Sequence, residues 1–213
     1  MKPAVDYSLY LVVGRENVRE NELVPSIEKA IIGGCTIVQL REKKSSSKEF
    51  YETALEVKTL TDKYKIPLII NDRVDIALAI DADGVHVGQS DLPASAVRKL
   101  IGENKIMGVS VSNYLEARDA QSEGADYLGI GAMFPTDTKP EANGASMTQL
   151  KIIRNETDLP LVIIGGMNEK TLMLFEFNEI DGVAVVSSVL SADDISRAAK
   201  NLKVIIDDIR RKP

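Results

Sequence analysis

Residues 67–87 read PLIINDRVDIALAIDADGVHV, and this stretch decides the fold class. A short apolar run, Pro67–Ile70, is followed almost at once by a helical pattern over Arg73–Ile80 and then by a second run, Gly84–Val87. A strand, a helix and a strand in close succession are typical of a βαβ unit, whose two strands lie parallel with a right-handed crossover. The stretch therefore predicts a parallel sheet covered by helices.

The same alternation continues on both sides of this unit. Further strands are expected at Leu9–Val13, Thr36–Leu40, Ile106–Val109, Tyr127–Gly131, Leu161–Ile164 and Gly182–Val186. Apolar residues at three-to-four spacing predict further helices at Glu22–Ile32, Ser47–Tyr64, Pro93–Ile101, Tyr114–Glu123, Thr148–Arg154, Glu169–Phe177 and Asp193–Arg211. Eight units favour a closed (β/α)8 barrel, the TIM-barrel fold, as a single domain over residues 1–213. An open doubly wound sheet is the alternative, but no glycine fingerprint follows the first strand.

Composition narrows the class of protein. With 213 residues, of which 44% are hydrophobic and 27% charged, the chain has the profile of a soluble globular protein. The net charge of −6 leaves no basic stripe for a nucleic-acid partner. The N-terminus shows no secretion signal, and no apolar run approaches the roughly 20 residues of a membrane span, so we expect a cytoplasmic protein. The lone Cys35 lies in an apolar run and is expected to be a buried small hydrophobe.

Cationic residues stand where the second strand ends. Gln39, Arg41 and Lys43 alternate along an extended chain, so their side chains share one face. In a (β/α)8 barrel the carboxyl ends of the strands carry the site. Arginine binds phosphate oxygens through two N–H groups and lysine binds them as a point charge, so this row predicts a phosphate site.

Carboxylates stand after the third and fourth strands. Asp72 directly follows the run that ends in Asn71, and Asp91 follows the fourth strand. Each could be a helix cap. Together, beside a phosphate-binding row, they favour a Mg2+ site, because Mg2+ takes one or two carboxylates together with substrate phosphate oxygens.

A second anion site is expected at the last two strands. Strand seven ends in Gly165-Gly166 and strand eight in Val186-Ser187-Ser188. In phosphate-binding barrels the loops at these positions present backbone N–H groups to a phosphate. The long loop after strand six, with Thr136, Thr138 and Lys139, is a candidate lid or anion clamp.

His86, the only histidine, lies on the fourth strand. It is expected to be a hydrogen-bonded wall residue rather than a metal ligand. No activated nucleophile such as a Ser–His pair is visible in the sequence.

Six motifs carry a family resemblance. They are Gln39-Leu40-Arg41-Glu42-Lys43, Asn71-Asp72-Arg73, Gly88-Gln89-Ser90-Asp91, Phe134-Pro135-Thr136-Asp137-Thr138-Lys139, Gly165-Gly166 and Val186-Ser187-Ser188. In this order, over nearly the whole chain, they resemble the thiamine-phosphate synthase family. The resemblance implies a transferase of thiamine biosynthesis. It would join hydroxymethylpyrimidine diphosphate to thiazole phosphate, or to a carboxylated thiazole with loss of CO2, and release pyrophosphate.

The resemblance also implies a role for each site residue. The pyrimidine diphosphate would be bound by Gln39, Leu40, Arg41, Glu42, Lys43, Asn71, Ser110 and Lys139. The catalytic residues among them would be Arg41, Lys43, Ser110 and Lys139. The thiazole phosphate would be bound by Thr136, Asp137, Thr138, Gly166, Val186 and Ser187, and one Mg2+ per subunit by Asp72 and Asp91.

Several rival functions stay open at the level of sequence. A thiazole tautomerase would need a general acid/base. Many relatives carry a histidine shortly after the serine that matches Ser110, and in this fold family a histidine there is associated with the tautomerase. This chain reads Ser110-Val111-Ser112-Asn113, so the missing histidine counts against that function. Another phosphate-binding barrel, such as a sugar-phosphate epimerase or an indole-forming synthase, would leave the Asp72/Asp91 pair unexplained. A non-catalytic thiazole-phosphate binding protein is the third rival. The expected partners are the small-molecule substrates, and a homo-oligomer is left open.

Overall fold

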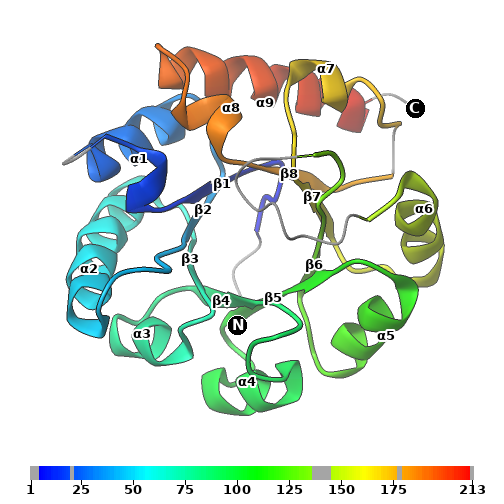
Figure 1. Ribbon diagram of the computed structural model, residues 1–213, viewed down its shortest axis with the longest axis horizontal. Coiled ribbons are helices and arrows are strands. Elements are labelled where there is room, and N and C mark those ends of the chain that lie inside the picture. The colour runs from blue at the N-terminus through cyan, green and yellow to red at the C-terminus, as the bar shows by residue number, and fades with distance from the viewer. Residues whose placement is uncertain (1–4, 20–21, 136–144, 177–178, 212–213) are drawn as a thin grey trace.

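The computed structural model describes residues 5–19, 22–135, 145–176 and 179–211. Within these ranges eight parallel strands follow one another in chain order, and β8 pairs with β1 to close a barrel (Figure 1). The strands are β1 (Leu9–Val13), β2 (Ile37–Leu40), β3 (Leu68–Asn71), β4 (Gly84–Val87), β5 (Ile106–Val111), β6 (Tyr127–Ile130), β7 (Leu161–Ile164) and β8 (Gly182–Val185). The predicted (β/α)8 barrel is confirmed, and the open sheet is excluded because β1 and β8 are paired.

Helices surround the ring of strands (Figure 1). They are the 3-10 helix η1 (Arg15–Asn17) and the α-helices α1 (Leu23–Ile32), α2 (Ser47–Tyr64), α3 (Val74–Ala79), α4 (Ala94–Ile101), α5 (Tyr114–Ser122), α6 (Met147–Glu156), α7 (Glu169–Leu172), α8 (Ser187–Leu190) and α9 (Ile195–Arg211). The short α8 was not expected. It is separate from α9 because Asp194 caps the later helix, its Oδ1 accepting from the Arg197 N–H at 2.9 Å. Helix α7 ends at Leu172, earlier than predicted, and Phe177 lies outside the described residues.

The strands are buried on both faces, which explains their nearly continuous apolar sequences. Strand β1 shows the alternation: Leu9, Leu11 and Val13 pack under the helices, while Tyr10 and Val12 point into the barrel. The interior cluster also contains Tyr7, Ile37, Ile69, Ile106, Tyr127, Val162 and Ala184. These side chains fill the lower barrel, and the space inside the barrel lies toward the carboxyl ends of the strands.

Gly108 makes room for Tyr127 inside the barrel. A Cβ atom at Gly108 would lie 2.1 Å from Cζ of Tyr127. We expect Gly108→Ala to lower the free energy of unfolding by about 1–3 kcal/mol, the usual range for overpacking a filled core. Urea denaturation measures this loss. In a double-mutant cycle with Tyr127→Leu the alanine is expected to cost less, because the ring that it meets is gone. A Gly108→Ala protein as stable as the wild type would contradict this packing.

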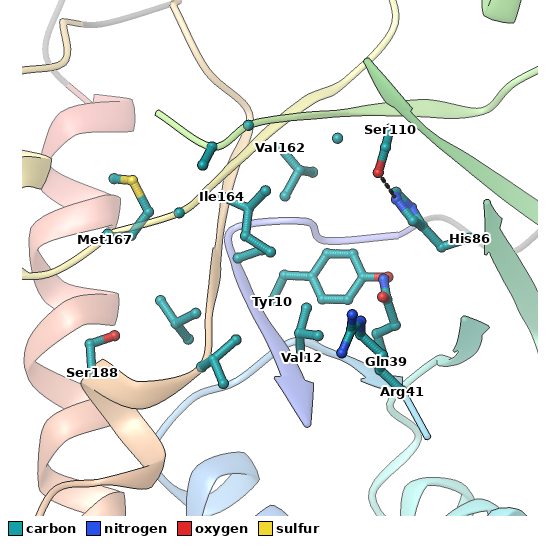
Figure 2. A pocket seen from close by; sticks show the side chains of 18 of the residues that line it. Tyr10, Val12, Gln39, Arg41, His86, Ser110, Val162, Ile164, Met167 and Ser188 are labelled. Atoms are coloured by element: carbon teal, nitrogen blue, oxygen red, sulfur yellow. Dashed lines mark hydrogen bonds between the residues drawn. The ribbon is translucent and has the colours of Figure 1, made fainter. Parts of the chain in front are cut away.

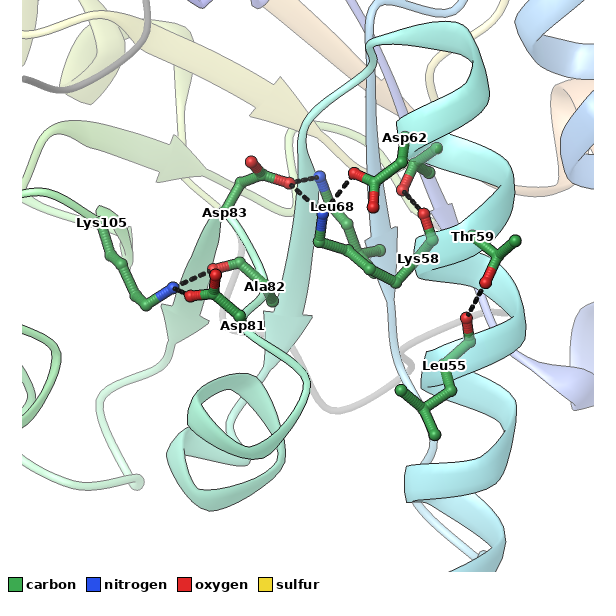
Figure 3. Close-up of polar contacts among 10 residues, drawn as sticks. Leu55, Lys58, Thr59, Asp62, Leu68, Asp81, Ala82, Asp83 and Lys105 are labelled. Carbon is green, nitrogen blue, oxygen red and sulfur yellow. Dashed lines mark hydrogen bonds and ion pairs between the residues drawn. The ribbon is translucent and has the colours of Figure 1, made fainter.

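Polar contacts at the opposite, amino-terminal end of the barrel link neighbouring strands (Figure 3). The Asp83 carboxylate, just before β4, accepts from the Leu68 N–H at 2.9 Å. Lys105, just before β5, donates to Asp81 and to the Ala82 carbonyl, at 2.6 Å in each case. These bonds satisfy backbone groups and hold strand starts in register, which is the role expected of this face of the fold.

Cys35 is buried, as predicted, and burial raises the pKa of its thiol to about 12. The thiol is therefore protonated and behaves as a small apolar group. Over the ranges that the structure describes, we find no helix with the length and apolar character needed to cross a membrane.

Candidate active site

A cavity of about 410 Å3 lies inside the barrel, toward the carboxyl ends of the strands. Every strand contributes to its wall (Figure 2). Of the predicted site residues, the cavity is lined by Gln39, Arg41, Asn71, Ser110, Gly166, Val186 and Ser187. Residues separated by more than 140 positions in the sequence are thus brought to one cavity, as expected when parallel strands end at the same rim.

The row after β2 divides between two faces, as the alternation of an extended chain requires. Gln39 and Arg41 line the cavity, and the Arg41 guanidinium lies 3.2 Å from a carboxylate oxygen of Glu16. Leu40 is fully buried among the core residues under the helices. Glu42 is also buried and accepts hydrogen bonds from the Arg15 N–H at 2.7 Å and from a serine hydroxyl. Any contact of Leu40 or Glu42 with a ligand would therefore use the backbone.

Lys43, Asp72 and Asp91 are not among the residues that line the cavity, but they form a charged group after the ends of β2, β3 and β4. The ammonium group of Lys43 pairs with the Asp72 carboxylate. Asp72 follows β3 with a positive φ of 61°, and its N–H donates to the His86 carbonyl at 2.8 Å. The Asp91 carboxylate accepts from the Gly88 N–H at 2.8 Å. Asp72 and Asp91 thus lie in the loops after β3 and β4, where their carboxylates interact with each other.

The two carboxylates suit a divalent cation. Burial raises the pKa of Asp91 above its ordinary value, and the nearby Asp72 carboxylate raises it further, whereas the Gly88 N–H acts in the opposite direction. Two carboxylates that disfavour each other's charge are stabilised by a cation between them. Among the described residues no group of three or more His, Cys, Asp or Glu side chains could hold a metal. Mg2+ needs only one or two carboxylates when phosphate and water complete its shell, so the pair fits Mg2+ rather than a fully protein-bound metal.

The rim at β7 and β8 supplies backbone groups and hydroxyls. Gly165 and Gly166 have positive φ angles of 97° and 65°, which favour glycine. A Cβ at Gly166 would lie 2.7 Å from Phe134, so a side chain would also close the gap. Ser187 starts α8, and the buried Oγ of Ser188 has no hydrogen-bond partner among the described residues. This part of the wall can accept an anion through N–H and O–H donors.

A relay of hydrogen bonds crosses the floor of the cavity, and the sequence did not predict it. Gln39 Nε2 donates to the Tyr10 hydroxyl at 2.9 Å, and the hydroxyls of Tyr10 and Tyr127 are 2.8 Å apart. The Tyr127 hydroxyl lies 2.8 Å from His86 Nδ1. His86 Nε2 lies 2.8 Å from Ser110 Oγ, the contact drawn in Figure 2. A tyrosine at an inward position of an apolar strand was the available signal.

His86 is a hydrogen-bonded wall residue, as predicted. No activated nucleophile was visible in the sequence, yet the barrel brings Ser110 of β5 against His86 of β4. The pair is invisible in the sequence because 24 positions separate its members. Asn71 and Ser110 also lie within β3 and β5, rather than just after them.

The loop after β6 is described only in part. Gly131 and Ala132 line the cavity. Thr136, Asp137, Thr138 and Lys139 lie outside the described residues, so their assignments stay predictions from the sequence.

Comparisons with known proteins agree with this arrangement. The family model described as thiamine monophosphate synthase matches residues 9–189. Curated thiamine-phosphate synthases of Clostridium beijerinckii and Alkaliphilus oremlandii are 56% and 55% identical, each over 95% of this chain and 97% of the relative. The solved thiamine phosphate pyrophosphorylase of Pyrococcus furiosus superposes with a TM-score of 0.85 at 35% identity, over 96% of this chain and 98% of that one. With its motifs at one rim and these relatives along almost its whole length, the chain belongs to the thiamine-phosphate synthase family.

Proposed function

We propose that the chain condenses 4-amino-2-methyl-5-hydroxymethylpyrimidine diphosphate with 4-methyl-5-hydroxyethylthiazole phosphate to give thiamine phosphate and pyrophosphate. The observation that carries the proposal is the cavity, where residues of both predicted anion sites meet in a member of this family. A carboxylated thiazole phosphate would react with loss of CO2. The unit that performs the reaction is the single barrel domain of residues 1–213, acting in the cytoplasm.

Each side of the cavity would hold one substrate. Arg41 and Lys43, with Lys139, would bind the diphosphate, and Gln39, Asn71 and Ser110 would bind the pyrimidine. Backbone N–H groups at Gly166, Val186 and Ser187, with Thr136, Asp137 and Thr138, would bind the thiazole phosphate. Holding the thiazole nitrogen against the pyrimidine CH2 group converts a bimolecular encounter into a step within one complex.

In this proposal the cationic groups would surround the leaving group. Asp72 and Asp91 would hold one Mg2+, which when bound supplies positive charge to the diphosphate oxygens and so eases departure. Arg41, Lys43 and Lys139 would stabilise the same developing charge. The bond from CH2 to the diphosphate oxygen breaks, and the thiazole nitrogen forms the new bond to that carbon.

We infer that departure runs ahead of attack. The proposed arrangement would place positive charge at the leaving group, while both ring nitrogens of His86 are already hydrogen-bonded. If the order is right, 18O placed in the bridging position of the pyrimidine diphosphate will scramble during turnover. Retention of the label would contradict it.

The direct test is to mix both phosphorylated substrates with the purified protein and Mg2+. We expect thiamine phosphate and pyrophosphate in equal amounts by mass spectrometry and a coupled phosphate assay. EDTA should stop the reaction and added Mg2+ restore it, with the unfolding midpoint unchanged, because the Asp91–Gly88 and Asp72–Lys43 contacts need no metal. Isomerisation of a thiazole without pyrophosphate release would favour the tautomerase, and binding without any product would favour the non-catalytic thiazole-phosphate binding protein.

A further inference from the structure

The relay across the cavity floor has a direction. An amide nitrogen can only donate, so the Tyr10 oxygen accepts from Gln39 Nε2. The Tyr10 hydroxyl is buried, and among the described residues its one other hydrogen-bond partner is the Tyr127 oxygen, 2.8 Å away, so its single proton points there. Burial raises the pKa of both phenols well above the ordinary value, so each keeps its proton. Tyr127 in turn has one proton to give, and His86 Nδ1 lies 2.8 Å from its oxygen.

This direction decides the tautomer of His86. A neutral imidazole carries one proton, and a ring nitrogen that accepts leaves the proton on the other. With Nδ1 accepting from Tyr127, the proton is on Nε2 and is donated to Ser110 Oγ at 2.8 Å. The Ser110 hydroxyl proton is then left over and can point only away from His86. Ser110 lines the cavity (Figure 2), and Gln89 Nε2 donates to its carbonyl at 2.8 Å.

We propose that Tyr10, Tyr127 and His86 are positioning residues, which fix Ser110 as a hydrogen-bond donor to an acceptor atom of the bound substrate ring. The identity of that ring as the pyrimidine rests on the proposed function. In this arrangement His86 is not a base for Ser110, although the two form a Ser–His pair. A serine activated as a nucleophile needs the opposite direction, with the imidazole accepting the serine proton.

The tautomer can be measured in the free wild-type protein by 15N NMR. The chain has a single histidine, so selective labelling gives one pair of ring nitrogens and no overlap. We expect the proton on the nitrogen that couples to both ring C–H protons, which is Nε2. A proton on Nδ1, alone or together with Nε2, would overturn the proposal, because Nδ1 would then donate to the Tyr127 oxygen instead of accepting from it. This result does not depend on which substrates the enzyme uses.

Tyr127→Phe removes the donor to His86 and keeps the ring. A neutral hydrogen bond contributes about 0.5–1.5 kcal/mol, so we expect kcat to fall by about threefold to tenfold, with KM for the thiazole phosphate unchanged. The 15N spectrum should then show both tautomers. Tyr7→Phe is the matched control, because the Tyr7 ring packs 4.9 Å from that of Tyr127 but lies outside the relay and the cavity wall. A purely structural role for Tyr127 would leave both kcat and the tautomer as they are, and would overturn the proposal.

Substitutions of His86 separate donation from packing. In His86→Gln the side-chain amide can still donate to Ser110, whereas His86→Leu fills similar space without a donor. We expect His86→Gln to keep more of kcat than His86→Leu, with circular dichroism showing both folded. Equal loss in both variants would contradict the donor role. If the wild type itself formed no thiamine phosphate, the proposed function would fail while the 15N result still decided the direction of the relay.

Discussion

Asp72→Asn and Asp91→Asn are each expected to lower the rate of pyrophosphate release by roughly 100- to 1000-fold, the loss seen when one preorganised electrostatic group is removed. Each variant should also need more Mg2+ for half-maximal rate, because a neutral amide replaces a charged ligand. Single-turnover pyrophosphate release across a Mg2+ titration measures both effects.

Asparagine is the right replacement at both positions. Asp72 has a φ of 61°, a region that asparagine enters with little strain and alanine does not. At position 91 the amide oxygen can still accept from the Gly88 N–H, so the loop is kept. The fold should therefore persist, and the lost rate should report the cation.

Asp75→Asn is the control for charge alone. Asp75 lies three positions from Asp72, on α3, with 65% of its side chain exposed and an ion pair to Arg73. Asp75→Asn removes one negative charge near the same rim, as Asp72→Asn and Asp91→Asn do. We expect its rate of pyrophosphate release to be nearly unchanged. Wild-type rates for Asp72→Asn and Asp91→Asn at every Mg2+ concentration would show that the metal site has been assigned to the wrong residues.

Arg41→Met should reduce kcat/KM for the pyrimidine diphosphate by about 10- to 100-fold, since a hydrogen bond to a charged group contributes about 1.5–3 kcal/mol. Arg41→Lys should recover only part of this loss, because lysine keeps the charge but not the paired N–H donors. KM for the thiazole phosphate should stay the same, because that substrate would bind at the far side of the cavity. Steady-state kinetics with each substrate varied in turn separates the effect on the pyrimidine diphosphate from the effect on the thiazole phosphate.

Stability is expected to change little in either Arg41 variant. The partner of Arg41 is Glu16, whose side chain is 35% exposed, and exposed ion pairs contribute at most about 1 kcal/mol. Glu16→Gln removes the same ion pair without touching the guanidinium, so it should keep full kcat/KM. Equal losses in Glu16→Gln and Arg41→Met would mean that the pair supports the loop and does not bind the diphosphate.

Local sequence patterns were enough to predict the architecture. Alternating apolar runs and helical spacing depend on short segments, so residues 67–87 predicted the βαβ unit that the structure contains as β3, α3 and β4. The residues at which strands end were harder to predict. Asn71 and Ser110 are polar, and their composition resembles a loop, yet parallel pairing with the neighbouring strands keeps both in the sheet.

The sequence by itself determined the barrel, and it predicted the rim as the place of the site and the residue types that could bind two anions and one cation. Each of these follows from the order of residues along a strand or helix. Only the tertiary structure decided which inward side chains meet. Tyr10 and Tyr127 are 117 positions apart, and their hydroxyls are hydrogen-bonded because closing the barrel brings inward side chains of β1 and β6 together in its interior. A period of two tells which face a side chain takes, but strand register and barrel closure choose its partner. The Ser110–His86 pair, and with it the direction of the relay, exists for that reason.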